Sequence, residues 1–179
     1  MKIIRKEDRT TTKWSGGTTS ELFIYPEGSS FITGDFDMRI SLATVESSPT
    51  VFTKLEGVTR TLMVMEGTQL LEHENEHTAD LKTFQRDTFS GDWNTKCTGT
   101  SINFNVMCKN DAFVRVQSIP LVKGMKGKLD LVDTLVFLYL KEGSITIDGE
   151  IVEKDSSVVL DKPVNLEVME DAIMIEVTL

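Results

Sequence analysis

Short runs of alternating or wholly apolar residues, each ended by a turn residue, recur along the entire chain and constrain its fold more than any other feature. Residues 35–45 and 102–107 alternate with a period of two, as half-buried strands do. Residues 60–67 and 135–140 are almost entirely apolar, as expected of strands buried on both faces, and Gly67 is expected to mark a turn. Helical periodicity barely appears. The sequence therefore predicts an all-β protein.

The strand pattern occurs twice. At 62–68 and again at 137–144, an apolar strand is followed by an acidic residue, a glycine and a hydroxyl residue. Between the two blocks, residues 112–127 contain the proline, glycines and lysines of a connecting segment. A repeated β unit predicts two similar sandwiches or barrels in one chain. We assign them to residues 1–118 and 119–179, with strands shared between the halves and the halves packed as one unit.

The charge balance limits the classes of partner. The chain has 19 Lys and Arg against 28 Asp and Glu, a net charge of −9. Nucleic acid and anionic membranes are therefore not expected as partners, since both reward concentrated positive charge. The first seven residues are too short and too charged for a signal peptide, and no segment approaches the roughly 18 apolar residues of a membrane span. We expect a soluble cytoplasmic protein in which Cys97 and Cys108 are reduced.

Residues 14–21, Trp-Ser-Gly-Gly-Thr-Thr-Ser-Glu, have neither a strand nor a helix period and are expected to form a shaped loop. Paired glycines permit close backbone approach, the hydroxyls offer donors and acceptors, and Trp14 supplies a flat apolar wall. Two interpretations stay open, a tight turn beside a core tryptophan or a loop that lines a ligand site.

Asn103 and Asn105 fall on one face of an expected strand. Asparagine is depleted in strands because its side chain competes for the backbone hydrogen bonds. Their side chains therefore face either a bound molecule or water, and the sequence leaves both readings open.

Residues 73–77 spell His-Glu-Asn-Glu-His, the H-E-x-x-H pattern of zinc proteases. That chemistry needs a helix, on which two imidazoles one turn apart bind zinc while the glutamate activates water. The flanking residues are strand-like and Asn75 is a good turn residue, so we expect a polar hairpin tip instead. The chain has only these two histidines, so we expect no cofactor and no metal-dependent cupin enzyme. His73 and His77 remain weak candidates for metal ligands, because histidines opposed at a hairpin can capture an adventitious ion.

Five spaced motifs together resemble the HutD/Ves family: Trp14 to Glu21, Arg39 to Ala43, Gly57 to Arg60 before a strand ending at Gly67, Phe89 to Asp92, and Asn103 to Met107. The resemblance covers most of residues 1–120, and the later half matches mainly as cupin-like strand and turn spacing. It implies an RmlC-like jelly-roll fold, a cupin-like double β-barrel or sandwich (bicupin). HutD members are linked to histidine catabolism and are thought to bind a small acidic intermediate of that pathway, and Ves members are linked to the stress response.

The resemblance also implies a ligand site in the first barrel. Its expected residues, from the mouth inward and along the wall, are Trp14, Thr19, Glu21, Arg39, Ser41, Arg60, Phe89, Asp92 and Asn105. Two guanidiniums inside a barrel suit a carboxylate ligand, because arginine binds carboxylate oxygens with a planar fork. The alternative for Arg39 and Arg60 is that they pair with Glu21, Asp92 or Glu66 to satisfy a buried charge.

These observations predict a protein that binds a small acidic metabolite, with a metabolic regulatory or stress-related role, rather than an enzyme. One alternative is a metal-free cupin enzyme in which Glu21 or Asp92 is the general base, with its pKa raised by burial. Another is a structural or partner-binding subunit, since the apolar strands at 135–140 and 172–177 suit a homodimer surface as well as a core.

Overall fold

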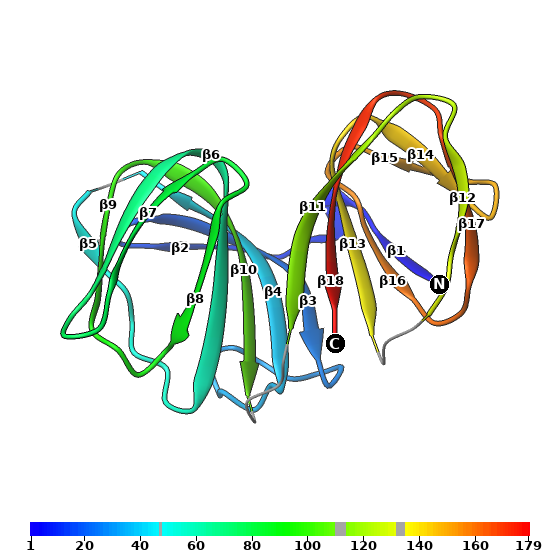
Figure 1. Cartoon of the computed structure of the whole chain (residues 1–179). Helices are drawn as coiled ribbons and strands as arrows, with labels where there is room; N and C mark the ends of the chain where they lie inside the picture. The colour runs from blue at the N-terminus through cyan, green and yellow to red at the C-terminus, as the bar shows by residue number, and fades with distance from the viewer. Residues whose placement is uncertain (47, 110–113, 132–134) are drawn as a thin grey trace. The chain divides into compact units, whose positions relative to one another are not determined.

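The computed structural model of the chain describes residues 1–46, 48–109, 114–131 and 135–179. Within these ranges the chain consists of β-strands, turns and one short 3-10 helix, η1 (Lys6–Asp8), which confirms the all-β prediction. The strands form two compact units (Figure 1). We call Thr10–Ala112 the first unit, and Met1–Arg9 together with Phe113–Leu179 the second unit.

The first unit is an antiparallel arrangement in which one long strand pairs with four others. Its strands are β2 (Thr11–Trp14), β3 (Gly17–Tyr25), β4 (Met38–Val45), β5 (Thr50–Val51), β6 (Val58–His73), β7 (Thr78–Lys82), β8 (Arg86–Ser90), β9 (Thr95–Thr98) and β10 (Ser101–Lys109). The hydrogen-bonded order is β2-β3-β4-β10-β6-β9-β5, and β7 and β8 also pair with β6. The curled sheets place the buried residues Leu62, Val64, Leu71, Phe89 and Cys97 in a shared core.

The long strand β6 bends at Gly67 and so takes part in both halves of the first unit. Up to Gly67 it pairs with β10 and β8, and beyond it with β7 and β9. Gly67 has a φ of 82°, and a Cβ at this position would lie 2.3 Å from the carbonyl oxygen of Thr100. Only glycine fits such a close backbone approach. The expected turn at Gly67 was wrong, because the strand continues to His73.

The second unit is a sandwich of two antiparallel sheets. Its strands are β1 (Lys2–Ile4), β11 (Arg115–Leu121), β12 (Lys126–Leu129), β13 (Val136–Glu142), β14 (Ser144–Ile147), β15 (Glu150–Glu153), β16 (Ser157–Leu160), β17 (Val164–Val168) and β18 (Ala172–Thr178). One sheet has the order β1-β16-β13-β18-β11 and the other β12-β17-β14-β15. Their facing side chains, among them Leu138, Leu140, Ile145, Leu166 and Met174, form one buried core.

The two units divide the chain differently from the expected boundary after residue 118. That boundary falls inside β11, which pairs along its whole length with β18. The N-terminal strand β1 pairs with β16 and therefore belongs with the later residues. Both differences arise from pairings between residues that are distant in sequence.

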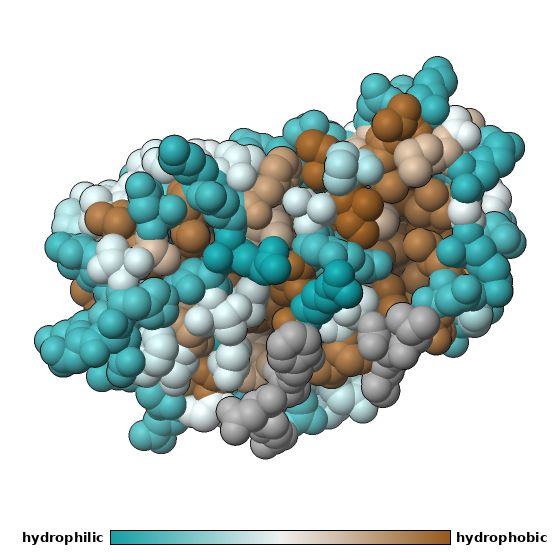
Figure 2. Space-filling view, in the orientation of Figure 1, coloured by the Kyte–Doolittle hydropathy of each residue, from teal (hydrophilic) through white to brown (hydrophobic). Residues whose placement is uncertain are grey.

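The surface carries mixed side chains. Figure 2 shows hydrophilic residues spread over the visible face with apolar patches between them. The exposed apolar residues include Val122, Met125 and Met169 of the second unit. Over the ranges that the structure describes, no helix has the length and apolar character needed to cross a membrane.

Candidate functional site

The first unit contains a cavity of about 250 Å³. Strands β2, β3, β4, β5, β6 and β10 contribute residues to its wall, as do the β2–β3 turn and the segments before β4 and after β5. Six residues expected at a ligand site line it: Trp14, Thr19, Arg39, Ser41, Arg60 and Asn105. The structure therefore brings together most of the predicted set.

Trp14 and Ser15 reach the cavity from a tight hairpin. Trp14 pairs with Gly17, and Ser15 and Gly16 form the turn. The tryptophan ring covers Gly16 so closely that a Cβ there would lie 2.0 Å from the ring atom Cζ3. The expected irregular loop is thus a hairpin, and its hydroxyl residues pair across strands, as in the 2.8 Å contact between the Oγ1 atoms of Thr18 and Thr44. The turn interpretation is correct, and Trp14 also lines the cavity.

Arg39, on β4, is held by a carboxylate. Its Nε donates a hydrogen bond to Oε2 of Glu21 at 2.9 Å. The guanidinium also lies over the ring of Phe31, with Cζ 4.3 Å from the ring centroid. The side chain is only 7% exposed. Arg39 therefore has both the expected carboxylate partner and a place in the cavity wall.

Arg60, on β6, has no ion pair with any residue that the structure describes. The residue is 7% exposed, and its Nε is buried without a hydrogen-bond partner. Its guanidinium lies against two aromatic rings, with Cζ 4.7 Å from the centroid of Phe52 and 5.2 Å from that of Phe89. Burial, followed by the repulsion of Arg39, lowers the pKa of Arg60 to about 10. At neutral pH the cavity wall therefore holds a cation without a counter-charge from the described residues.

Asn103 and Asn105 occupy alternate positions of β10 and present their amides to the same cavity. They are 1% and 4% exposed, so neither faces bulk water. The Oδ1 atom of each is buried without a hydrogen-bond donor. Buried acceptors in this state are costly, and they are satisfied when a bound molecule supplies N–H or O–H groups.

Three expected site residues lie outside the cavity lining. Glu21 does not line the cavity itself, but its carboxylate accepts a hydrogen bond from Arg39, which does. Phe89 belongs to the core and contacts Arg60 with its ring. Asp92 is exposed, and its Oδ2 accepts hydrogen bonds from the backbone of Gly57 and the hydroxyl of Ser90, at 3.4 and 3.2 Å. It closes a turn after β8 rather than the expected wall, because the chain reverses direction there.

Sequence reasoning missed other parts of the wall. Phe31 and Phe52 line the cavity from segments without regular periodicity, so no pattern marked them. Thr12 also lines the cavity, but nothing in the sequence around it apart from its hydroxyl suggests a binding role. Asn103 could have been included, since its position in a strand was already unusual.

The H-E-x-x-H residues form a polar hairpin tip, as predicted. β6 ends at His73, β7 begins at Thr78, and Asn75 has a φ of 62°. The backbone N–H of His73 donates to the carbonyl oxygen of His77 at 2.9 Å. This geometry excludes the helix that a zinc protease of this pattern requires.

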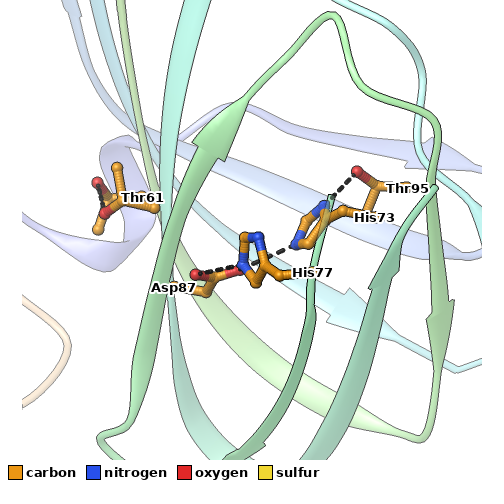
Figure 3. A network of polar contacts seen from close by, with 6 residues as sticks. Thr61, His73, His77, Asp87 and Thr95 are labelled. Atoms are coloured by element: carbon orange, nitrogen blue, oxygen red, sulfur yellow. Dashed lines mark hydrogen bonds and ion pairs between the residues drawn. The ribbon is translucent and has the colours of Figure 1, made fainter. Parts of the chain in front are cut away.

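Asp87 of β8 contacts both histidines through its carboxylate (Figure 3). Its Oδ2 is 2.9 Å from Nε2 of His73 and 3.0 Å from Nε2 of His77. On the other side of the His73 ring, Nδ1 lies 2.8 Å from Oγ1 of Thr95. Desolvation lowers the pKa of the His73 imidazole, and the bond to Asp87 opposes that effect. No sequence pattern connected Asp87 with the histidines.

The HutD family model matches residues 6–175 of the chain. Among solved structures, a conserved protein of unknown function from Pseudomonas aeruginosa PAO1, PA5104, is 21% identical with a TM-score of 0.82, over 99% of this chain and 97% of that one. HutD from Pseudomonas fluorescens SBW25 is 19% identical with a TM-score of 0.75, over 99% and 97% of the two chains. No curated protein sequence matches the chain.

A cupin 2 conserved barrel domain protein from Leptotrichia buccalis shares the fold at 14% identity and a TM-score of 0.61, over 99% of this chain and 96% of that one. At these identities the structural likenesses establish the fold alone. They confirm the predicted cupin-like double β-barrel.

Proposed function

The chain belongs to the HutD family, and from the cavity of its first unit we propose that it binds a small carboxylate-bearing metabolite. The net charge of the chain is −9, yet none of the described residues that line the cavity carries a carboxylate, and two carry guanidiniums. The cavity is thus a locally positive site in an acidic protein. Such a site attracts a small anion in preference to other parts of the surface.

The guanidinium of Arg60, which has no ion pair with any described residue, is the observation that carries the proposal. A buried charge without a partner is strongly unfavourable, and proteins retain one mainly where function needs it. Arg60 is 7% exposed, and its Nε has no acceptor. A carboxylate is the natural complement, because its two oxygens match the donor fork of arginine.

The other polar groups of the wall favour a ligand that also carries donors. The Oδ1 atoms of Asn103 and Asn105 are buried acceptors without donors, and Ser41 adds a hydroxyl to the same wall. The cavity volume of about 250 Å³ lies below the roughly 300–1,000 Å³ of sites for drug-sized molecules. The ligand we propose is therefore a small metabolite with a carboxylate at one end and N–H or O–H groups at the other.

Acidic intermediates of histidine degradation meet this description. Urocanate, formylglutamate and formiminoglutamate each combine a carboxylate with an N–H group. HutD from Pseudomonas fluorescens was solved in a formate condition, and formate is the smallest carboxylate. Binding of such an intermediate would give the protein a metabolic regulatory role, in which its occupancy reports the metabolite concentration.

Thermal shift and calorimetry with these three acids test the proposal. A ligand at about 100 times its dissociation constant adds about 2.7 kcal/mol to the free energy of unfolding, which raises the midpoint of a chain this size by several degrees. We expect the shift in the wild type and its loss in Arg60→Met. The matched control is Arg86→Met, which removes the same charge from an exposed position on β8, the strand paired with β6.

A second control alters the ligand. Fully esterified methyl esters of the same acids, with both carboxyl groups of the two glutamate derivatives blocked, keep the N–H groups but have no carboxylate, so we expect them to give no shift. If no acid stabilises the wild type, or if Arg60→Met responds as the wild type does, the carboxylate site is wrong.

A metal-free enzyme acting on the same acids is the alternative. Glu21, one expected general base, is bonded to Arg39, and Asp92, the other, does not line the cavity. Binding without turnover is therefore the better supported function. Conversion of any of the three acids by the wild type, lost in Glu21→Gln or Asp92→Asn, would favour the enzyme instead.

A further inference from the structure

Independently of the proposed function, we propose that His73, His77 and Asp87 form a binding site for one divalent transition-metal ion of the zinc class. Two imidazole nitrogens and a carboxylate oxygen are a donor set that suits Zn²⁺ and its first-row neighbours. None of the three residues lines the cavity of Arg60. The metal site and the carboxylate site can therefore be tested independently, and failure of one proposal does not affect the other.

The distances between the donor atoms fit a metal ion. One ligand atom from each residue lies within 4.8 Å of the others. The Nε2 atoms of His73 and His77 lie 2.9 and 3.0 Å from the same carboxylate oxygen of Asp87. Around a tetrahedral ion with bonds of about 2.0–2.1 Å, neighbouring donor atoms lie about 3.3 Å apart. Each of these two separations is therefore within a few tenths of an ångström of the value expected around an ion.

The more buried histidine is already oriented for this role. Its Nδ1 lies 2.8 Å from Oγ1 of Thr95, itself 1% exposed. When Nε2 binds a metal, Nδ1 carries the proton and donates it to such an oxygen, as metal-ligating histidines generally do. The ring of His73 also packs against Phe89 and Trp93, with centroids 4.5 and 5.5 Å away. These contacts fix the imidazole before any ion arrives.

The second histidine leaves the site accessible. The side chain of His77 is 41% exposed, whereas that of His73 is fully buried. An ion can therefore arrive from solvent, and water can complete the coordination that three protein ligands leave open. Glu74, the glutamate of the H-E-x-x-H letters, accepts a hydrogen bond from Nδ2 of Asn94 at 2.7 Å. The site is therefore built from β6, which carries His73, from the β6–β7 hairpin, which carries His77, and from β8, which carries Asp87. The carboxylate of β8 takes the place of the third ligand that a helix would supply in a zinc protease.

Calorimetric titration of metal-free, untagged protein with Zn²⁺ tests the site. The chain has only two histidines, so a histidine-dependent signal can be assigned without ambiguity. We expect one ion per chain in the wild type and at least about 10-fold weaker binding in His77→Ala and in Asp87→Asn, since loss of an outer partner alone costs about 10–100-fold. Co²⁺ should give a visible absorption band in the wild type that both variants lose.

Glu76→Gln is the matched control, because it removes one negative charge from the same hairpin without removing a ligand. Its affinity for Zn²⁺ should equal that of the wild type. Thr95→Val, which removes the outer partner of His73, should weaken binding about 10-fold. Circular dichroism of each metal-free variant verifies that it is folded, and the exposed His77→Ala change keeps the test valid if Asp87→Asn unfolds. The proposal is overturned if the wild type does not bind Zn²⁺, or if folded His77→Ala binds it as tightly as the wild type.

Discussion

Arg39 and Arg60 line the same cavity, but only Arg39 has a carboxylate partner among the described residues, with its Nε 2.9 Å from Oε2 of Glu21. The two guanidiniums are close enough that the charge of Arg39 contributes to the lowered pKa of Arg60. Burying two cations with one counter-charge lowers the stability of the empty protein. The same imbalance prepares the cavity for an anion, which would supply the missing charge on binding.

Arg60→Met should therefore stabilise the ligand-free protein. Methionine keeps the contacts with Phe52 and Phe89 but removes the desolvated charge, and replacing poorly compensated buried charge by apolar groups is worth about 1–3 kcal/mol. Urea unfolding at neutral pH measures this gain. The exposed change Arg86→Met should stay within about 0.5 kcal/mol of the wild type. If Arg60→Met were less stable than the wild type, the positive charge of Arg60 would have to be stabilised by interactions other than the contacts described above.

The stability advantage of Arg60→Met over the wild type should decrease at high pH and should not change near neutrality. Burial in the folded protein lowers the pKa of Arg60 to about 10, so the folded state carries the full cost of the charge at any pH below 10. As pH rises above 10, the folded state loses this proton more readily than the unfolded state, in which the arginine keeps its higher, ordinary pKa, and the cost of the buried charge is relieved. The advantage of the variant should be constant from pH 6 to 9 and should shrink above about pH 10. An advantage that shrinks between pH 6 and 8 would point to another group.

Asn103→Leu should separate ligand binding from stability. The buried Oδ1 of Asn103 has no donor in the structure, so an apolar side chain of similar shape should leave the free energy of unfolding unchanged or raise it. If Oδ1 accepts a hydrogen bond from the ligand, affinity should fall by roughly 2- to 10-fold, equivalent to one such bond. Calorimetry with the tightest-binding acid measures the second effect. Loss of stability together with unchanged affinity would contradict this role.

Part of the candidate site could be predicted from the sequence, because some of its residues are unusual for the strands in which they lie. Asn103 and Asn105 were identifiable because polar amides at alternate strand positions conflict with strand propensity, and both prove to be buried in the cavity wall. Alternation and turn residues likewise predicted many of the strands, but not the hairpin of β2 and β3 or the continuation of β6 through Gly67. Such local patterns are visible because they arise from a few neighbouring residues.

Features created by distant pairing could not be predicted in this way. Asp87 meets the histidines only because β6 pairs with both β7 and β8. The N-terminal strand joins the second unit through β16, more than 150 residues away in the register of Lys2 with Val159. No local pattern encodes these contacts, since they depend on which strands become neighbours.

Glu21→Gln should lower the free energy of unfolding of the ligand-free protein, whereas Arg60→Met should raise it. The change removes the carboxylate that accepts the hydrogen bond from Arg39 and leaves the cavity with two uncompensated cations. Breaking a fully buried pair in this way costs about 3–5 kcal/mol. The Glu21 side chain is 31% exposed, so solvent screening reduces the expected loss to about 1–2 kcal/mol. Chemical unfolding measures the loss, and a saturating carboxylate ligand should restore part of it. A variant as stable as the wild type would show that solvent already screens Arg39.

Gly67→Ala tests whether the bend of β6 depends on glycine. Gly67 and Gly57 both have positive φ, 82° and 65°. A Cβ at Gly67 would lie 2.3 Å from the carbonyl oxygen of Thr100, whereas one at Gly57 meets no atom within 4 Å. Gly57→Ala should therefore lose only the backbone strain of about 1–2 kcal/mol, and Gly67→Ala should lose that amount plus the energy of the clash, for a total of about 3 kcal/mol or more. Urea unfolding of both variants measures the difference. Equal losses would mean that the backbone at Thr100, just before β10, can move away from β6. The bend would then be maintained by strand pairing rather than by the close approach at Gly67.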